Sequence, residues 1–229
     1  MAHIRTLLVD VRKLDRQGEE GAIVVSLMMA CNDLTAANQA LGACRDDSDE
    51  KTDYIRRGAA MYFIRLQMAH LHEALKIVKR INTHANLLSL INDCPDGTAD
   101  HFAELLCFAE GGTKRCDFKK YVGSVRNKIA FHYDKEKIKS ALSDRARRRG
   151  DVAHFMTVAD DIRRVRFQVA DDLVNTLVCH HVWEIATDAD TRIVADQKAD
   201  FGFKIYKIFL DFAGVFITRY VEKNATFAA

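Results

Sequence analysis

Residues 61–78 read MYFIRLQMAHLHEALKIV, and this stretch decides the fold class of the chain. Its apolar side chains recur at alternating steps of three and four residues, which places them on one face of an α-helix. The repeating positions are Met61, Ile64, Met68, Leu71, Leu75 and Val78. We therefore predict a long amphipathic helix over about residues 53–82, with this face buried in the protein.

The same spacing recurs on both sides of this stretch. Upstream, it predicts a helix over about residues 19–44 whose apolar face consists of Ile23, Leu27, Ala30, Leu34, Ala37 and Leu41. Downstream, it favours helices over about residues 113–134, 171–187 and 200–224. The last of these carries a stripe of Phe201, Ile205, Ile208, Phe212 and Val215, widened by Phe209, Phe216 and Tyr220. A helix with so broad an apolar arc is predicted to lie at the centre of a bundle or at a subunit interface.

Glycine and proline are scarce, with 11 Gly and one Pro in 229 residues. Because both residues disrupt helices, these counts favour long helices. Between residues 153 and 169, Val165, Phe167 and Val169 alternate with polar residues, a pattern that allows a small β-hairpin. The sequence thus predicts an all-α, multi-helix bundle in a single domain over residues 1–229, with a small hairpin near residues 153–169.

Composition places the chain among ordinary globular proteins, at 48% hydrophobic and 29% charged residues. The N-terminus lacks the apolar stretch and cleavage site of a signal peptide. The longest apolar run, residues 22–31, is too short to span a bilayer. The six cysteines form no CxxC pair and are interpreted as reduced thiols. We therefore expect a cytoplasmic protein with no membrane association.

The positive charge of the chain is concentrated in its middle. Residues 114–149 hold thirteen Lys and Arg against four Asp and Glu, a net charge of +9. The rest of the chain holds 21 basic and 28 acidic residues, a net charge of −7. A basic segment within an acidic chain indicates a polyanionic partner such as nucleic acid, although a solvated basic helix face has the same composition.

The basic segment contains the candidate site, residues 126–133, RNKIAFHY. At about 100° per residue, the helix leading into it buries one face, made of Phe118, Tyr121, Val122, Val125 and Ile129. Arg126 and His132 flank this face, about 120° apart around the helix axis. That separation is too wide for contact within one helix but suits two helices related by a twofold axis, so we expect a homodimer.

An Arg and a His brought together can cleave RNA without a metal ion. Because imidazole titrates near neutral pH, His132 could accept the proton of a ribose 2′-hydroxyl or protonate the leaving oxygen. Arg126 could bind the phosphate oxygens and stabilise the charge that develops there. DNA lacks the 2′-hydroxyl, so this chemistry selects RNA. Lys119, Lys120 and Lys128 would hold the RNA backbone, and we expect neither a metal nor another cofactor.

The segment from Arg126 to His132 resembles the R-x(4–6)-H motif of the HEPN superfamily (higher eukaryote and prokaryote nucleotide-binding domains), in which a polar residue commonly follows the Arg. These proteins are helical bundles, often homodimeric, and many are metal-independent ribonucleases of toxin–antitoxin, phage-defence or RNA-processing systems. The resemblance covers about one helix. It implies that Arg126 and His132 are catalytic, that Asn127 orients or binds, and that an antitoxin or another protein could be a partner. Tyr133 is assigned to binding or packing.

Other interpretations of the same residues remain open. Arg126 could pair with an acid on a neighbouring helix, and His132 could cap a helix C-terminus, where the helix dipole favours its charge. The protein would then be a non-catalytic helical module that binds a protein partner or a nucleotide, with the aromatic last helix as its interaction surface. Elsewhere, His70 and His72 point apart on their helix, and His181 on its apolar stripe is interpreted as a core histidine, so we predict no metal site at these positions.

Overall fold

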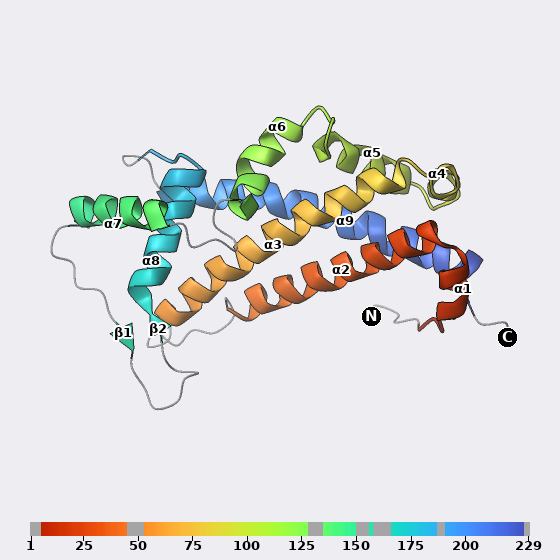
Figure 1. Ribbon diagram of the computed structural model, residues 1–229, viewed down its shortest axis with the longest axis horizontal. Coiled ribbons are helices and arrows are strands. Elements are labelled where there is room, and N and C mark those ends of the chain that lie inside the picture. Colours follow the sequence, from red (N-terminus) through yellow and green to blue (C-terminus); the bar gives the residue numbers. More distant parts are fainter. Residues whose placement is uncertain are drawn as a thin grey trace. The chain divides into compact units, whose positions relative to one another are not determined.

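The computed structural model describes residues 6–44, 53–127, 135–149, 156–157, 166–186 and 191–226, and helices dominate these residues (Figure 1). In chain order the elements are α1 (Val11–Arg16), α2 (Glu19–Ala43), α3 (Asp53–Ile81), α4 (Ala85–Asn92), α5 (Thr98–Phe108), α6 (Arg115–Phe118), the π-helix η2 (Lys119–Gly123), α7 (Lys135–Arg149), β1 (Met156–Thr157), β2 (Arg166–Phe167), α8 (Gln168–Thr176), the π-helix η5 (Leu177–Val182) and α9 (Thr191–Asn224). The all-α prediction is confirmed.

The strands β1 and β2 form one short antiparallel pair. Met156 lies opposite Phe167, and Thr157 lies opposite Arg166. This pair falls in the region where the sequence allowed a hairpin, and residues 158–165 between the strands lie outside the described part of the chain. The two strands form a two-stranded sheet, and helix α8 begins at Gln168, directly after β2.

The helical periodicity correctly identified the buried faces of the long helices. On α2, Leu27 and Leu34 are both 0% exposed, and on α3, Leu71 and Val78 are 2% and 0% exposed. Met61, at the start of the predicted α3 face, is only partly buried. Alternating steps of three and four residues are therefore sufficient to locate the core side of these helices.

The structure divides into two compact units. Unit 1 comprises Met1–Asp33, Glu73–Arg115 and Lys204–Ala229, and unit 2 comprises Leu34–His72 and Cys116–Phe203. The division falls within α2, α3 and α9, so each of these helices supplies residues to both units. Whether the chain is one domain, as the sequence suggested, stays a prediction.

The core of unit 1 is built on the aromatic residues of α9. The rings of Phe102 and Phe212 lie 5.2 Å apart, those of Phe212 and Phe216 lie 5.4 Å apart, and the Tyr220 ring lies 6.5 Å from Phe216. Phe209, Phe212 and Phe216 are 0% exposed. Of the predicted stripe, Ile205 and Phe212 are buried, whereas Val215 is 37% exposed, so the buried face of α9 instead includes Phe209, Phe216 and Tyr220. The packing of these aromatic rings within the chain accounts for their apolar character without a subunit interface.

The two ends of the chain meet in unit 1. An isolated β-bridge joins Val9 and Thr226, and the Asp10 amide donates a hydrogen bond of 2.8 Å to the carbonyl oxygen of Ala225. The Lys13 ammonium donates a hydrogen bond of 2.6 Å to the carbonyl oxygen of Thr226. These bonds fix α1 against the end of α9.

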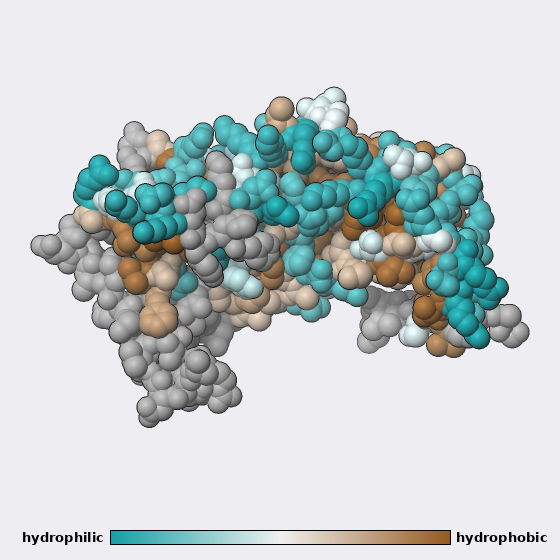
Figure 2. Space-filling view, in the orientation of Figure 1, coloured by the Kyte–Doolittle hydropathy of each residue, from teal (hydrophilic) through white to brown (hydrophobic). Residues whose placement is uncertain are grey.

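The core of unit 2 forms around residues 115–127, the motif helix, which leads into the candidate site. Phe118, Val122 and Val125 are all 0% exposed, and Trp183 is 2% exposed. Helix α9 approaches them closely at Gly202, where an added Cβ would lie 3.9 Å from a methyl group of Val122. The basic helix α7 is anchored in the same unit by Ala141, which is 0% exposed, while hydrophilic side chains cover its outer face (Figure 2).

Helix α2 is the one described helix that is long and apolar enough to cross a membrane, by length and composition alone. The apolar run of residues 22–31, which the sequence analysis judged too short, lies within this helix of 25 residues. A core helix passes the same test, and 39% of its most apolar window is buried in the structure. The buried face through Leu27, Leu34 and Leu41 has the pattern of a core helix.

Candidate functional site

The helix that leads into the predicted motif is not a regular α-helix. It begins as α6, widens into η2 at Lys119–Gly123, returns to α-helix at residues 124–125 and is π-helical again at Arg126 and Asn127. The Ser124 amide donates to the carbonyl oxygen of Lys119, five residues earlier, and the Ser124 hydroxyl donates to the same oxygen at 2.9 Å. Such π turns are rare and occur frequently at functional sites.

The π turns change the rotation per residue that was expected along this helix. A π turn holds more residues than an α turn, so each π residue rotates the chain by less than about 100°. The uniform rotation used for this helix is therefore wrong over residues 119–123 and 126–127. Three residues of the predicted buried face, Phe118, Val122 and Val125, are nevertheless buried. Tyr121 is half-buried, and Ile129 lies outside the described residues.

Two side chains, His72 and Trp183, pack against the widened turn. The His72 ring on α3 stacks on Phe118 at 6.0 Å, and a Cβ added to Gly123 would lie 3.3 Å from His72 Nδ1. On another side, Trp183 Nε1 donates a hydrogen bond of 2.9 Å to the carbonyl oxygen of Tyr121. Glycine at position 123 thus makes room for the imidazole, while the indole binds a carbonyl group of the π segment.

The structure brings together Arg126 and Asn127, two of the predicted site residues. Arg126 Nη1 donates a hydrogen bond of 3.0 Å to Asn127 Oδ1. Asn127 is exposed, and Arg126 is partly exposed at the edge of the buried face. The amide side chain therefore orients one edge of the guanidinium group. Lys128, His132 and Tyr133 lie outside the described residues, so the pairing of Arg126 with His132 stays a prediction.

The predicted lysines lie on the same helix, and a third lysine joins them from α9. Lys119 and Lys120 are exposed, as a role in holding a polyanion requires. Lys120 Nζ lies 5.7 Å from the centroid of the Tyr121 ring, and Lys198 Nζ lies 4.2 Å from the same centroid. The edge of the Tyr121 ring packs against Phe201 at 5.4 Å. We define Lys120, Tyr121 and Lys198 as the lysine–tyrosine cluster.

Lys198 was missed because the last helix was predicted to begin near residue 200, whereas α9 begins at Thr191. Its position three residues before Phe201 is the sequence signal that could have indicated it, because residues three apart lie on one helix face. Burial lowers the pKa of Lys198, and the positive charge of Lys120 lowers it further, while Glu184 acts in the opposite direction. The two ammonium groups therefore repel each other.

The neighbouring histidines are paired within unit 2. His181 Nε2 lies 3.0 Å from Asp144 Oδ2 on α7, and its side chain is 27% exposed, so it is not the core histidine that we predicted. Asp144 also accepts a hydrogen bond of 3.2 Å from Arg147. His180 Nδ1 lies 2.8 Å from the carbonyl oxygen of Ile185. Of these contacts, the one between His181 and Asp144 joins the basic helix α7 to η5. Within the described ranges, no three His, Cys, Asp or Glu side chains gather as metal ligands.

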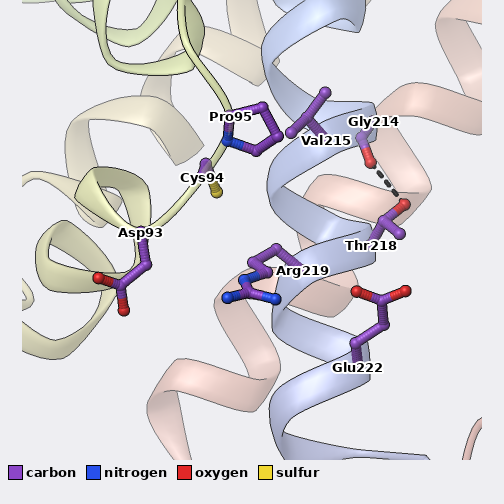
Figure 3. Close-up of a pocket in the computed structure, with 8 residues that line it drawn as sticks. All are labelled: Asp93, Cys94, Pro95, Gly214, Val215, Thr218, Arg219 and Glu222. Carbon is purple, nitrogen blue, oxygen red and sulfur yellow. Dashed lines mark hydrogen bonds between the residues drawn. The ribbon is translucent and has the colours of Figure 1, made fainter.

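Unit 1 contains a pocket of about 600 Å³ that none of the predicted site residues lines (Figure 3). Its lining residues are Asp93, Cys94, Pro95, Gly214, Val215, Thr218, Arg219 and Glu222. Figure 3 shows the Arg219 guanidinium extending from α9 toward the loop that carries Asp93 and Cys94. Burial raises the pKa of the Cys94 thiol, with Arg219 acting against this rise, so the thiol is a poor nucleophile at neutral pH. We assign no chemistry to this pocket.

No protein-family model matches the chain, and no curated protein or solved structure is significantly similar to it.

Proposed function

We propose that the protein acts on RNA as a HEPN-like, metal-independent endoribonuclease in which Arg126 and His132 carry the chemistry. One observation supports this proposal above the others. Arg126 lies on a π-widened helix with its guanidinium held by Asn127 at 3.0 Å, on the same helix as the exposed Lys119 and Lys120. Functional sites frequently occupy such irregular turns, and a pre-oriented guanidinium is suited to a phosphate.

The proposed reaction uses the ribose as its own nucleophile. His132 would accept the proton of the 2′-hydroxyl, or protonate the 5′-oxygen as the phosphodiester bond breaks. Arg126 would donate hydrogen bonds to the non-bridging oxygens and stabilise the negative charge that develops on them. The products would be a 2′,3′-cyclic phosphate and a free 5′-hydroxyl. Asn127 would keep the guanidinium in place during this step.

Binding of the RNA is proposed to depend on the basic residues around the motif. Lys119, Lys120 and Lys128 would contact the backbone, with Tyr133 beside them. Helix α7, with seven Lys and Arg against two Asp and Glu, adds positive charge in the same unit. We further propose a cytoplasmic homodimer with a role in RNA processing, phage defence or a toxin–antitoxin pair, in which case an antitoxin would be a protein partner.

The decisive experiment is RNA cleavage in the presence of a chelator. We expect the wild type to cut single-stranded RNA, to spare DNA of the same sequence, and to leave 2′,3′-cyclic phosphate ends. His132→Ala should reduce the rate by about 10²–10⁴-fold, the usual contribution of a positioned acid–base group. Arg126→Ala should reduce it by about 10²-fold or more, and Arg126→Lys should not restore it, because an ammonium lacks the planar fork.

Matched controls separate a loss of chemistry from a loss of structure. His101, half-exposed on α5, and Arg80, exposed near the end of α3, are residues of the same types outside the motif. His101→Ala and Arg80→Ala should cut as fast as the wild type. If His132→Ala also cuts at the wild-type rate, His132 has no catalytic role. A wild type that binds RNA without cutting it would identify the non-catalytic binding module instead.

A further inference from the structure

We propose that the lysine–tyrosine cluster of unit 2 is a phosphate subsite, which takes one backbone phosphate of the bound nucleic acid. The phosphate assignment rests on the geometry of Lys120, Tyr121 and Lys198, and the identity of the ligand as RNA rests on the proposed function.

The cluster places two positive charges around one aromatic ring. Lys198 Nζ lies 4.2 Å and Lys120 Nζ lies 5.7 Å from the Tyr121 centroid, both within the range of a cation–π contact. Within the described residues, neither ammonium group forms an ion pair, and Glu184 acts on Lys198 only at longer range. Two like charges held this close are unfavourable by themselves. A bound oxyanion would offset that repulsion with two attractive interactions.

The ring that organises the lysines is itself fixed in place. Its backbone carbonyl accepts the 2.9 Å hydrogen bond from Trp183, and the edge of the ring packs 5.4 Å from Phe201. The next residue, Val122, is 0% exposed, which anchors the chain on that side. The two ammonium groups therefore lie around a ring that is fixed, which reduces the rearrangement that binding would require.

The geometry favours the sugar–phosphate backbone over a base. Lys198 covers a face of the Tyr121 ring at 4.2 Å, so that face is not open for a base to stack on. Contacts to phosphate give binding without sequence preference and with strong salt dependence. Lys120 also precedes Arg126 by six residues, a rise of at most about 9 Å along a helix. A phosphate at the cluster would thus lie within a few nucleotides of the phosphate at Arg126.

The first test uses inorganic phosphate and the fluorescence of Trp183, the single tryptophan of the chain. Because the Trp183 indole is hydrogen-bonded to the Tyr121 carbonyl oxygen, its fluorescence emission reports on the cluster. We expect a saturable change with millimolar phosphate, but not with chloride at the same ionic strength. Lys198→Ala and Lys120→Ala should lose this response. Lys198→Met keeps the aliphatic stem over the ring and should also lose it, which separates charge from packing. Lys207→Ala, an exposed lysine on α9, should respond as the wild type.

The second test measures binding of labelled single-stranded RNA as a function of salt, in the His132→Ala background to prevent cleavage. Lys198→Met should weaken binding several-fold and reduce the slope of log K against log salt by about 0.7, the value for one contact to a single strand. Lys207→Met should change neither quantity. An unchanged phosphate response in the Lys198 variants would overturn the subsite, as would tighter binding of a polyglutamate peptide than of RNA through Lys198. A phosphate response that needs both lysines, without any RNA binding, would leave the subsite standing and overturn the proposed function.

Discussion

The indole Nε1 of Trp183 donates a hydrogen bond of 2.9 Å to the carbonyl oxygen of Tyr121, 62 residues earlier in the chain. Trp183 directly follows the π-helix η5, and Tyr121 lies in the middle of the π-helix η2. The bond therefore joins the two irregular helical segments of unit 2. The indole N–H can only donate a hydrogen bond, and the pair is part-buried. The Tyr121 carbonyl oxygen therefore supplies the acceptor that the indole needs away from water.

We expect Trp183→Phe to destabilise the protein by about 2–3 kcal/mol, since it removes the hydrogen bond to the Tyr121 carbonyl and part of a buried, packed ring. Urea unfolding followed by circular dichroism measures the change. Tyr121→Phe is the control, because it keeps the backbone carbonyl and the ring. A Trp183→Phe variant as stable as the wild type would show that the bond contributes nothing to the fold.

Two glycines of unit 2 should respond in opposite directions to alanine. At Gly123 an added Cβ would lie 3.3 Å from the buried His72 ring, which Phe118 prevents from moving aside. Gly123→Ala should therefore cost about 1–2 kcal/mol through overpacking. At Gly202 the nearest atom would lie 3.7 Å away, an ordinary contact. Gly202→Ala should stabilise α9 by up to about 1 kcal/mol, because alanine favours helix over glycine. Thermal unfolding of both variants tests the contrast, and equal shifts would contradict it.

Stability at alkaline pH should depend on Tyr220. Burial raises the pKa of this phenol to about 12, above its ordinary value of 10.0. The folded state therefore prefers the neutral phenol, and the unfolded chain releases the proton first as pH rises. The contribution is fully present below pH 10 and is lost between about pH 10 and 12. Tyr220→Phe should flatten the fall in unfolding free energy across this range, and an unchanged pH profile would exclude the effect.

The cysteines should differ widely in their rate of alkylation. Burial raises the pKa of Cys31 and of Cys179 to about 11, so almost none of either thiol is ionised at neutral pH. Cys116, at the start of the motif helix, is exposed. We expect iodoacetamide to modify Cys116 before Cys31 and Cys179, as peptide mass spectrometry would show. Cys116→Ser should remove the fast phase, and equal rates in denaturant would confirm that burial is the cause.

The fold class and the buried helix faces followed from the sequence because they depend on local periodicity. Leu71 and Val78 are core residues in any packing of an amphipathic α3. The π turns could not be predicted in this way, because Phe118, Val122 and Val125 have a spacing that a regular α-helix would also satisfy. What accompanies the widening is the contact with His72 and the bond from Trp183, and both partners are distant in sequence. Lys198 was missed because the last helix was predicted to begin after it, near residue 200, and its contact with Tyr121 on another helix cannot be predicted from periodicity.

The discontinuous make-up of unit 1 has a consequence for synthesis on the ribosome. Its three segments are Met1–Asp33, Glu73–Arg115 and Lys204–Ala229, and its aromatic core draws on Phe102 from the second and Phe212 from the third. A nascent chain that has released α2 to α5 still lacks the α9 part of that core until residues 204–224 leave the exit tunnel. Native packing of unit 1 must therefore wait for α9, and the apolar faces of the earlier helices are exposed to chaperones until this helix arrives.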